Sequence, residues 1–333
     1  MCNNSGPPYE YGVGSRVILG IFLLILIVLT ILGNLVVITS VLIFRKLRSV
    51  TNAFVVSLAV ADLLVGVLVM PFDTYRQLSN AVWDLGKGMC LVATSFDVMF
   101  TTTSIIHLSC LAVDRYLAIC HCFIYHQYMN QRTSIILLFL CWTVPLLVSF
   151  MPIMNEWHAI GIEGLQLPHD VPACVFIVNK PMAIIGSLVA FYAPTIFMFV
   201  CNYRIFQAAK RQAQQIRNLE VATPSEIHHN KSMRHETKAA KTLTIVMGAY
   251  CVCWFPFFIC NIIDPFINYC IPAHVWLVAV WLGYVNSTIN PFLYYFFNRS
   301  FRKAFIHLLC LERCALVREF DANGNTTLST VSE

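Results

Sequence analysis

Three acidic positions stand inside long apolar stretches of this chain, and their chemistry needs an explanation. Asp62 and Asp97 each interrupt an otherwise uncharged run, and Asp114 is followed directly by Arg115. A charged group is costly in an apolar medium unless it is paired, so we expect a function for these residues beyond structural pairing. A lone carboxylate that opens to the aqueous side suits a cationic ligand, because an ammonium group offsets the cost of its burial.

Aromatic residues gather in two later apolar stretches. The first holds Trp254, Phe257 and Phe258, and the second holds Trp281 and Tyr284, which lie three residues apart. Each ring taken alone could pack against lipid or within a protein core. Ring faces also attract cations, so these rings together with the Asp97 carboxylate predict a site for an amine.

Further polar side chains fall near the middle of the apolar stretches: Asn34, Asp62, Ser104, Asn286, Ser287 and Asn290. Polar groups in lipid must be satisfied within the protein, so one interpretation is a network of interhelical hydrogen bonds. Oxygen ligands also suit hard cations, which makes Asp62, Ser104, Ser287 and Asn290 a candidate sodium site. We expect both arrangements at different times in a working cycle, and we expect no other cofactor.

Transmembrane helices must position these residues, because the composition excludes an ordinary soluble protein. Of the 333 residues, 58% are hydrophobic and 12% are charged, against about a quarter charged in globular domains. A bilayer core of about 30 Å requires about 20 apolar helical residues. Seven stretches meet this requirement: 17–44, 51–69, 88–113, 133–155, 181–203, 242–263 and 265–298. The predicted fold class is an all-α membrane protein, a bundle of seven transmembrane helices, with a polar loop at about 212–233.

The placement of basic residues predicts the orientation of the bundle. Of the 22 Lys and Arg residues, 18 fall in loops 44–51, 114–134 and 204–241 or beyond residue 298. Such an excess marks the cytoplasmic side. We therefore expect residues 1–15 to be extracellular at the plasma membrane, with Asn3 as a candidate glycan acceptor. The net charge of +5 reflects these loops, and no nucleic-acid partner is expected.

Motifs over nearly the whole chain resemble those of the rhodopsin-like G-protein-coupled receptors. They are Gly33-Asn34, Leu58-Ala59-Val60-Ala61-Asp62, Asp114-Arg115-Tyr116, Trp142, Pro194, Cys253-Trp254-Phe255-Pro256 and Asn290-Pro291-Phe292-Leu293-Tyr294. Within that family the chain looks like the biogenic-amine branch. The resemblance implies that Asp97 binds the amine and that the Tyr284 hydroxyl braces it. No lysine lies in the last span, which argues against an opsin.

Two subfamilies of that branch compete. Segments 150–154 and 236–243 resemble the type-4 serotonin receptors, whereas segments 257–260 and 264–266 also resemble the trace amine-associated receptors, some with an olfactory role. The fifth span offers Ser187 but no series of serines for catechol hydroxyls. That disfavours a catecholamine and permits an indole, a phenol or a plain alkylamine.

The resemblance implies a ligand site near the outer end of the bundle. Its members are Asp97, Val98, Thr101, Ser187, Ala190, Trp254, Phe257, Phe258, Asn261, Trp281 and Tyr284. Asp73, at the outer end of the second span, is either a solvated acid or a second anion that would suit a diamine. A disulfide between Cys90 and Cys174 is also implied, and pairing of Cys2 with Cys270 is a further hypothesis.

The resemblance also implies a coupling site for a heterotrimeric G protein, expected to be the stimulatory type that raises cyclic AMP, and then arrestin. Its members are Asp114, Arg115, Tyr116, Phe123, Asn202, Glu236, Asn290, Pro291 and Tyr294. At rest, Arg115 is expected to pair with Asp114 and Glu236, and activation swings the sixth span outward about Pro256. Asn202 stands where the family usually has a tyrosine, which leaves the efficiency of coupling open.

The resemblance places the transmembrane domain at 16–297, an amphipathic membrane-surface helix at 298–310 and a cytoplasmic tail at 311–333. Phe301, Phe305 and Leu308 recur at helical spacing, which fits this helix. Cys310 and Cys314 follow it as candidate palmitoylation sites.

Other classes of function remain as alternatives. An amine-binding decoy that does not couple to a G protein would share the outer site. A small-cation transporter could use a lone acid in its path, but no internal repeat is visible. An enzyme is not expected, because the sequence offers no set of nucleophile, base and acid.

Overall fold

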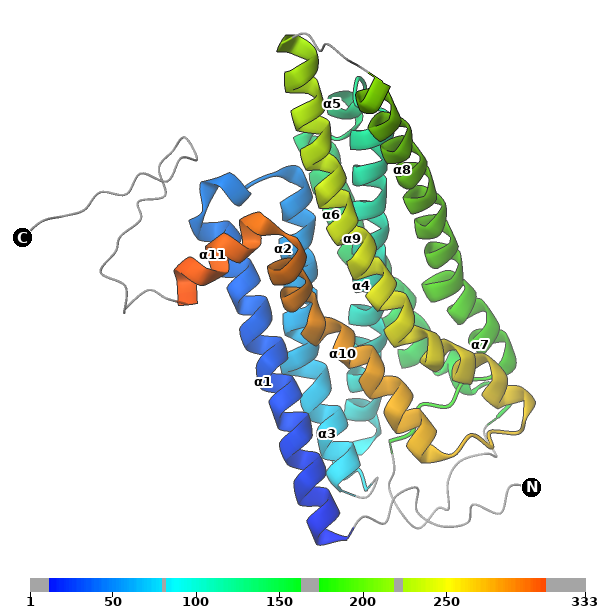
Figure 1. Ribbon diagram of the computed structural model, residues 1–333. Helices are drawn as coiled ribbons and strands as arrows, with labels where there is room; N and C mark the ends of the chain where they lie inside the picture. Colours follow the sequence, from blue (N-terminus) through cyan, green and yellow to red (C-terminus); the bar gives the residue numbers. More distant parts are fainter. Residues whose placement is uncertain (1–11, 80–81, 163–173, 219–223, 310–333) are drawn as a thin grey trace, which may run out of the picture.

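The computed structural model describes residues 12–79, 82–162, 174–218 and 224–309. Within them, long helices run side by side as a bundle (Figure 1). They are α1 (Val13–Ile43), α2 (Val50–Leu64) continued by α3 (Met70–Leu78), α4 (Gly86–Cys120), α6 (Gln131–Met154), α7 (Lys180–Ser187) continued by α8 (Ala193–Asn218), α9 (Pro224–Ile263) and α10 (Ala273–Phe297). Two shorter helices, α5 (Tyr125–Tyr128) and α11 (Arg299–Leu309), lie at one end. The predicted seven-helix bundle is confirmed.

Six of the spans are long and apolar enough to cross a membrane by composition alone. The seventh, α10, carries Asn286, Ser287, Thr288 and Asn290, which lower its hydropathy. All four side chains are buried against the bundle. Ser287 and Asn290 donate to Asp62 of α2, and Thr288 bonds to Thr30 of α1. Because other helices of the bundle bind these polar groups, α10 can complete the bundle in spite of its composition.

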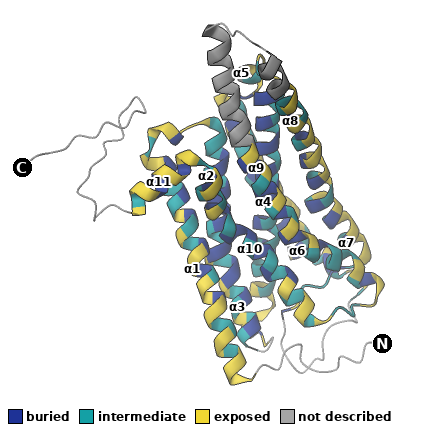
Figure 2. Cartoon of the chain, viewed as in Figure 1, coloured by how far each residue is buried: buried dark blue, intermediate teal, exposed yellow. Residues whose placement is uncertain are grey.

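α4 lies at the centre of the bundle. It packs against α2, α6, α8 and α9, while α10 packs between α1 and α9. Buried residues line the inward faces of the helices, and exposed residues line the outward faces (Figure 2). The outward faces are strongly apolar, as with Ile18 and Leu24 on α1. Such faces are stable in lipid and would promote aggregation in water.

Two spans contain a turn of π-helix that hydropathy does not reveal. One turn, Val65–Val69, joins α2 to α3, and the other, Leu188–Tyr192, joins α7 to α8. Pro71 lies in the first turn of α3, directly after the π-turn, and its missing N–H removes one backbone hydrogen bond from the continuous span. The second span therefore extends beyond its apolar run and carries Asp73 on a helix.

Two boundaries predicted from the sequence are wrong. The apolar pattern starts the last span at residue 265, but α10 begins at Ala273, after a loop in which Asn268 and Tyr269 adopt positive φ. The polar segment 212–233 is largely helical, because α8 continues to Asn218 and α9 starts at Pro224. Its Ala, Gln, Lys and Arg residues are good helix formers, and polarity alone does not end a helix.

α11 has the amphipathic character that its spacing predicts. Phe301, Ala304 and Phe305 are buried, and the Phe301 ring stacks on Tyr294 of α10 with centroids 5.5 Å apart. These contacts attach α11 to the end of α10 and tie its position to that span.

Candidate ligand and coupling sites

Asp97 lies on α4, and its carboxylate faces α10. The Tyr284 hydroxyl donates a hydrogen bond to Oδ2 of Asp97 at 3.1 Å. Tyr284 is buried, whereas Asp97 is only partly buried. The bond joins the third and seventh spans and leaves carboxylate lone pairs for a cation.

The aromatic residues of α9 form one continuous cluster. Trp254 and Phe257 meet edge to face with centroids 5.6 Å apart, and Phe258 stacks on Phe191 at 4.5 Å. Trp276 of α10 packs on Phe257, also at 5.6 Å. Sequence reasoning missed Phe191 and Trp276, since neither belongs to a motif and Phe191 lies on the π-turn.

Trp281 occupies different surroundings from the α9 rings. It contacts Tyr284 edge to face at 5.3 Å, but it packs within a cluster that includes Val69, Met70 and Phe100. Its ring therefore belongs to the side of the bundle formed by the second and third spans. It flanks Tyr284 and does not join the rings around Trp254.

The remaining ligand residues predicted from the sequence lie on α4 and on the fifth and sixth spans. The Asn261 side-chain amide donates to the Ser187 hydroxyl at 3.0 Å, which links α7 to α9. Val98, Thr101 and Ala190 are partly buried. Ser187 is fully buried, and its hydroxyl accepts the hydrogen bond from Asn261.

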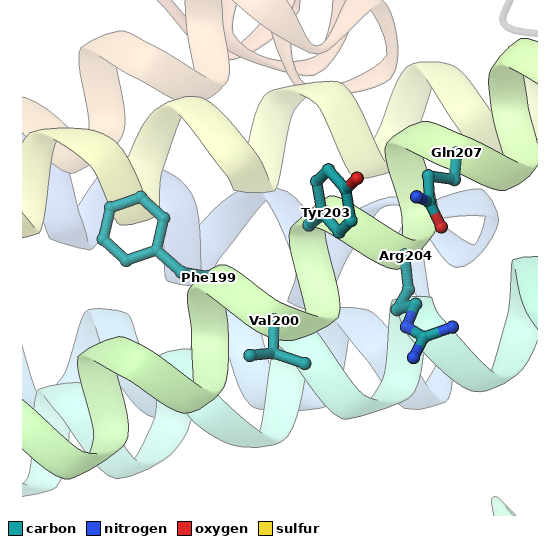
Figure 3. A pocket seen from close by; sticks show the side chains of 5 residues that line it. All are labelled: Phe199, Val200, Tyr203, Arg204 and Gln207. Atoms are coloured by element: carbon teal, nitrogen blue, oxygen red, sulfur yellow. The ribbon is translucent and has the colours of Figure 1, made fainter.

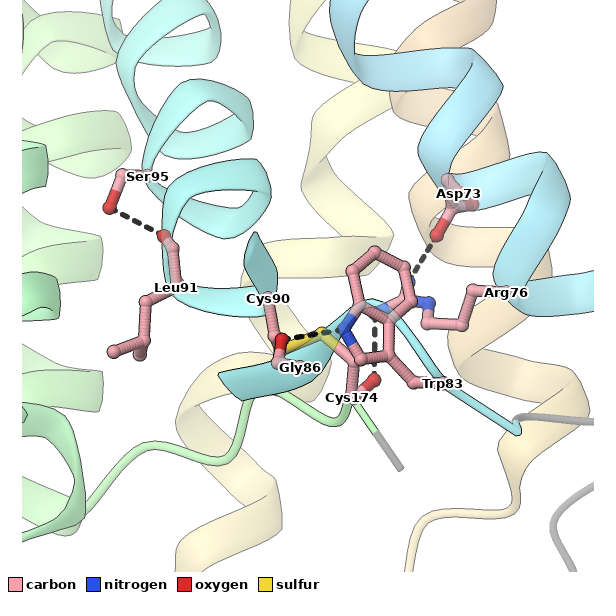
Figure 4. Close-up of a disulfide and its surroundings, with 8 residues drawn as sticks. All are labelled: Asp73, Arg76, Trp83, Gly86, Cys90, Leu91, Ser95 and Cys174. Atoms are coloured by element: carbon pink, nitrogen blue, oxygen red, sulfur yellow. Dashed lines mark hydrogen bonds and ion pairs between the residues drawn. A yellow bond between two sulfur atoms is a disulfide. The ribbon is translucent and has the colours of Figure 1, made fainter. Parts of the chain in front are cut away.

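Asp73 and Arg76 form an ion pair one turn apart on α3 (Figure 4). Arg76 also donates to the backbone carbonyl of Cys174 at 3.5 Å, and Cys174 forms a disulfide with Cys90. Asp73 is therefore a buried, paired acid and not a solvated one, and its role as a second anion for a diamine stays a prediction. The spacing of three residues on a helix could have indicated the pair, because such side chains are neighbours.

The polar residues around Asp62 form a buried network. Ser287 donates to Oδ1 of Asp62 at 2.7 Å, and Asn290 donates to Oδ2 at 2.8 Å. The Ser104 hydroxyl lies 3.5 Å from Oδ1, and Asn34 donates to the Ser287 carbonyl at 3.1 Å. The four residues of the candidate sodium site thus meet at one point. Three offer hydroxyl or carboxylate oxygens, a donor set that fits a hard cation.

At the opposite end of the bundle, the charged pair on α4 is closely held. Asp114 is fully buried and receives hydrogen bonds from Arg115 at 2.6 Å, Thr51 at 2.6 Å and Tyr125 at 2.8 Å. Burial raises the pKa of the Tyr125 phenol to about 12, and the Asp114 charge adds to the shift. Tyr125 therefore stays protonated and donates. The side chain of Glu236 lies outside the described residues, so its pairing with Arg115 stays a prediction.

Asn202 connects the fifth and sixth spans. Its amide donates to the Met198 carbonyl at 3.0 Å and to the Met247 sulfur at 3.1 Å. The Thr244 hydroxyl of α9 donates to Asn202 Oδ1 at 2.9 Å. The residue that departs from the family pattern thus holds α8 against α9.

The other coupling residues border the same end. Phe123 is 93% exposed, a large apolar side chain with no cover among the described residues. The Tyr116 hydroxyl lies 3.1 Å from the His121 ring nitrogen Nε2. Tyr294 is buried on α10, beyond Pro291.

A surface groove of about 500 Å³ runs along α8 and is lined by Phe199, Val200, Tyr203, Arg204 and Gln207 (Figure 3). None of these side chains belongs to the Asp97 site. Asn3, Cys2, Cys310 and Cys314 lie outside the described residues, so glycosylation, palmitoylation and the pairing of Cys2 stay predictions.

Comparison with known proteins assigns the whole bundle to one family. The family model described as 7 transmembrane receptor (rhodopsin family) matches residues 33–294. The chain is 48% identical over 321 residues to 5-hydroxytryptamine receptor 4 of Homo sapiens, covering 91% of this chain and 82% of that relative. It is 38% identical over 284 residues to Trace amine-associated receptor 1 of Macaca mulatta, covering 84% of each. It is 41% identical over 300 residues to Octopamine receptor beta-1R of Drosophila melanogaster, covering 84% of this chain and 59% of that relative.

Proposed function

Because the chain belongs to the rhodopsin family of seven-transmembrane receptors, in its biogenic-amine branch, we propose that it is a cell-surface receptor for an amine bound by Asp97. The hydrogen bond from Tyr284 to Asp97 carries this proposal. It holds a partly exposed carboxylate next to Tyr284, and Gly283, the residue before Tyr284 on α10, lies against the Trp254 ring of the α9 aromatic cluster. An ammonium group would pair with the carboxylate and contact the ring faces.

The ligand is an arylalkylamine with one ring hydroxyl, such as serotonin or tyramine. Asn261 is partly buried and is held by the buried Ser187, so it offers one partner for a ring hydroxyl between the fifth and sixth spans. A catechol would need a second partner there. The similarity to 5-hydroxytryptamine receptor 4 favours an indole ring.

Ligand binding shifts the population between two arrangements of the bundle. The amine contacts the aromatic cluster around Trp254, and α9 swings outward about Pro256, where the helix lacks one backbone hydrogen bond. The opening exposes the end that carries Arg115 and Phe123 to a helix of the stimulatory G protein. Cyclic AMP rises, and arrestin binds the same opening. The amino terminus is extracellular and the carboxyl terminus is cytoplasmic.

A sodium ion held at Asp62 would stabilise the resting arrangement. Asp62, Ser104 and Ser287 would hold the ion through oxygen atoms, with Asn290 beside them. The ion would supply a positive charge that offsets the buried carboxylate. Without the ion, Ser287 and Asn290 satisfy Asp62 by their own hydrogen bonds. The ion-bound site and the hydrogen-bonded network are therefore both accessible.

The test is cyclic AMP accumulation in cells that express the receptor, with serotonin, tyramine, phenylethylamine and histamine applied separately. Asp97→Asn keeps the shape of the side chain and removes its charge. We expect it to weaken the response at least about tenfold, because a charge-assisted hydrogen bond is lost. Asn155→Asp, which adds a carboxylate on the exposed end of α6, serves as a matched control and should leave the response unchanged.

One observation favours a second candidate, an amine-binding receptor that couples weakly or not at all. Asn202 holds α8 against α9 at the end where a G protein would enter. Thermal stabilisation of the purified receptor by an amine, without any cyclic AMP response in cells, would favour this candidate. Absence of both the thermal stabilisation and the cyclic AMP response would overturn the amine proposal.

A further inference from the structure

The charges around Asp97 include more than the amine-binding carboxylate. Asp73 and Arg76 pair on α3, beside the disulfide between Cys90 and Cys174 (Figure 4). Among the described residues, these two are the charged side chains that interact with Asp97. Both also interact with the Tyr284 phenol that donates to Asp97. Two carboxylates and one guanidinium therefore share the site and leave one net negative charge.

Asp73 depends on Arg76 for its neutralisation. Asp73 is only 6% exposed, its Oδ1 accepts from Arg76, and its Oδ2 is buried without a hydrogen-bond partner among the residues that the structure describes. Arg76 is itself anchored by the Cys174 carbonyl. A buried carboxylate that loses its counter-ion must find another cation or give up its charge.

We propose that Arg76 determines ligand specificity, by occupying Asp73 and so restricting the site to amines with a single positive charge. This inference rests on the proposed role of Asp97. One ammonium balances the one net negative charge. A diamine brings a second cation, which finds Asp73 already paired and is repelled by the guanidinium. Removing Arg76 leaves a second carboxylate for the second ammonium.

The proposal predicts the outcome of a charge series. Arg76→Gln leaves two net negative charges at the site, Asp73→Asn leaves none, and the double variant restores one. Arg76→Lys keeps the charge and is the matched control for the loss of the guanidinium shape. Selectivity should follow the net charge and not the identity of the residue at either position.

The probes are phenethylamine and 4-(aminomethyl)phenethylamine, which share a frame and differ by one ammonium group. Binding is measured as thermal stabilisation of the purified receptor, and cyclic AMP is measured in cells. We expect Arg76→Gln to raise the affinity for the diamine relative to the monoamine by about tenfold or more. The double variant and Arg76→Lys should keep the preference of the unmodified receptor for the monoamine.

Two results would contradict the inference in distinguishable ways. If Arg76→Gln leaves the ratio of diamine to monoamine affinity unchanged, with the monoamine still bound through Asp97, the role of Arg76 is overturned and the amine proposal stays intact. No effect of Asp97→Asn on the monoamine would overturn both. Should Arg76→Gln fail to reach the cell surface, the Asp73→Asn variant tests the role of Arg76 instead. It must weaken the monoamine by about tenfold, since Arg76 then competes for Asp97, and the double variant must restore it.

Discussion

At the scale of single residues, the position of the Trp254 ring depends on a glycine that the sequence motifs do not include. A Cβ atom on Gly283 would lie 2.7 Å from the Trp254 ring, closer than carbon atoms approach in folded proteins. The absence of a side chain on α10 therefore allows the indole of α9 to reach its resting position. The ring is rigid and packed against Phe257, so it cannot give way by a local rotation.

Gly283→Ala should displace Trp254 from its resting position. We expect a rise in basal cyclic AMP and a loss of about 1–3 kcal/mol in the free energy of unfolding, typical of an overpacked core. Thermal unfolding of the purified receptor and basal cyclic AMP measure the two effects. Gly248→Ala on α9 is the control, because nothing lies within 4 Å of its added Cβ. An unchanged melting temperature for Gly283→Ala would contradict the close packing.

At the scale of helices, the contact between α8 and α9 would oppose the outward swing proposed for α9. Asn202 accepts from Thr244 and donates to Met247, and both bonds cross this interface. A tyrosine at position 202 would be too large for the same arrangement. The departure from the family pattern thus has a structural consequence, namely a bond that favours the closed bundle.

Thr244→Val removes the donor and keeps the size of the side chain. A neutral hydrogen bond contributes about 1 kcal/mol, so we expect basal cyclic AMP to rise by about fivefold. Thr244→Ser keeps the hydroxyl and should behave like the unmodified receptor. Asn202→Tyr should raise the maximal response to an amine. Equal basal signalling in Thr244→Val and Thr244→Ser would show that the bond does not oppose activation.

At the scale of the whole molecule, charge and apolarity agree on one topology. The outward faces of the bundle are apolar, and most Lys and Arg residues lie beyond the end that carries Asp114. The disulfide lies at the other end, and disulfides persist in oxidising compartments. Both observations support the proposal that the Asp97 site faces outward.

The orientation is tested with epitope tags at the two termini. The amino-terminal tag should be stained on intact cells, and the carboxyl-terminal tag only after permeabilisation, because the basic loops stay in the cytoplasm. Staining of the carboxyl-terminal tag on intact cells would contradict this topology.

Cys174→Ser should lower surface staining of the amino-terminal tag, since the loop then loses its covalent attachment to α4.

The sequence by itself determined the seven spans and the residues that carry chemistry. Apolar runs of sufficient length have one stable form in lipid, so their number and approximate places follow from composition. Intramembrane charges are rare, so Asp62, Asp97 and Asp114 mark three candidate sites from the sequence alone. The predicted partners Tyr284 and Ser287 contact these carboxylates.

Only the tertiary structure decided which groups neutralise one another and which rings meet. The pairing of Arg76 with both Asp73 and the Cys174 carbonyl depends on the path of the second outer loop, which no local pattern encodes. The separation of Trp281 from the Trp254 cluster depends on helix rotation, and π-turns change that rotation without a clear sequence signal. Local pattern reports which side chains avoid water, whereas distances between distant segments are set by packing of the whole bundle.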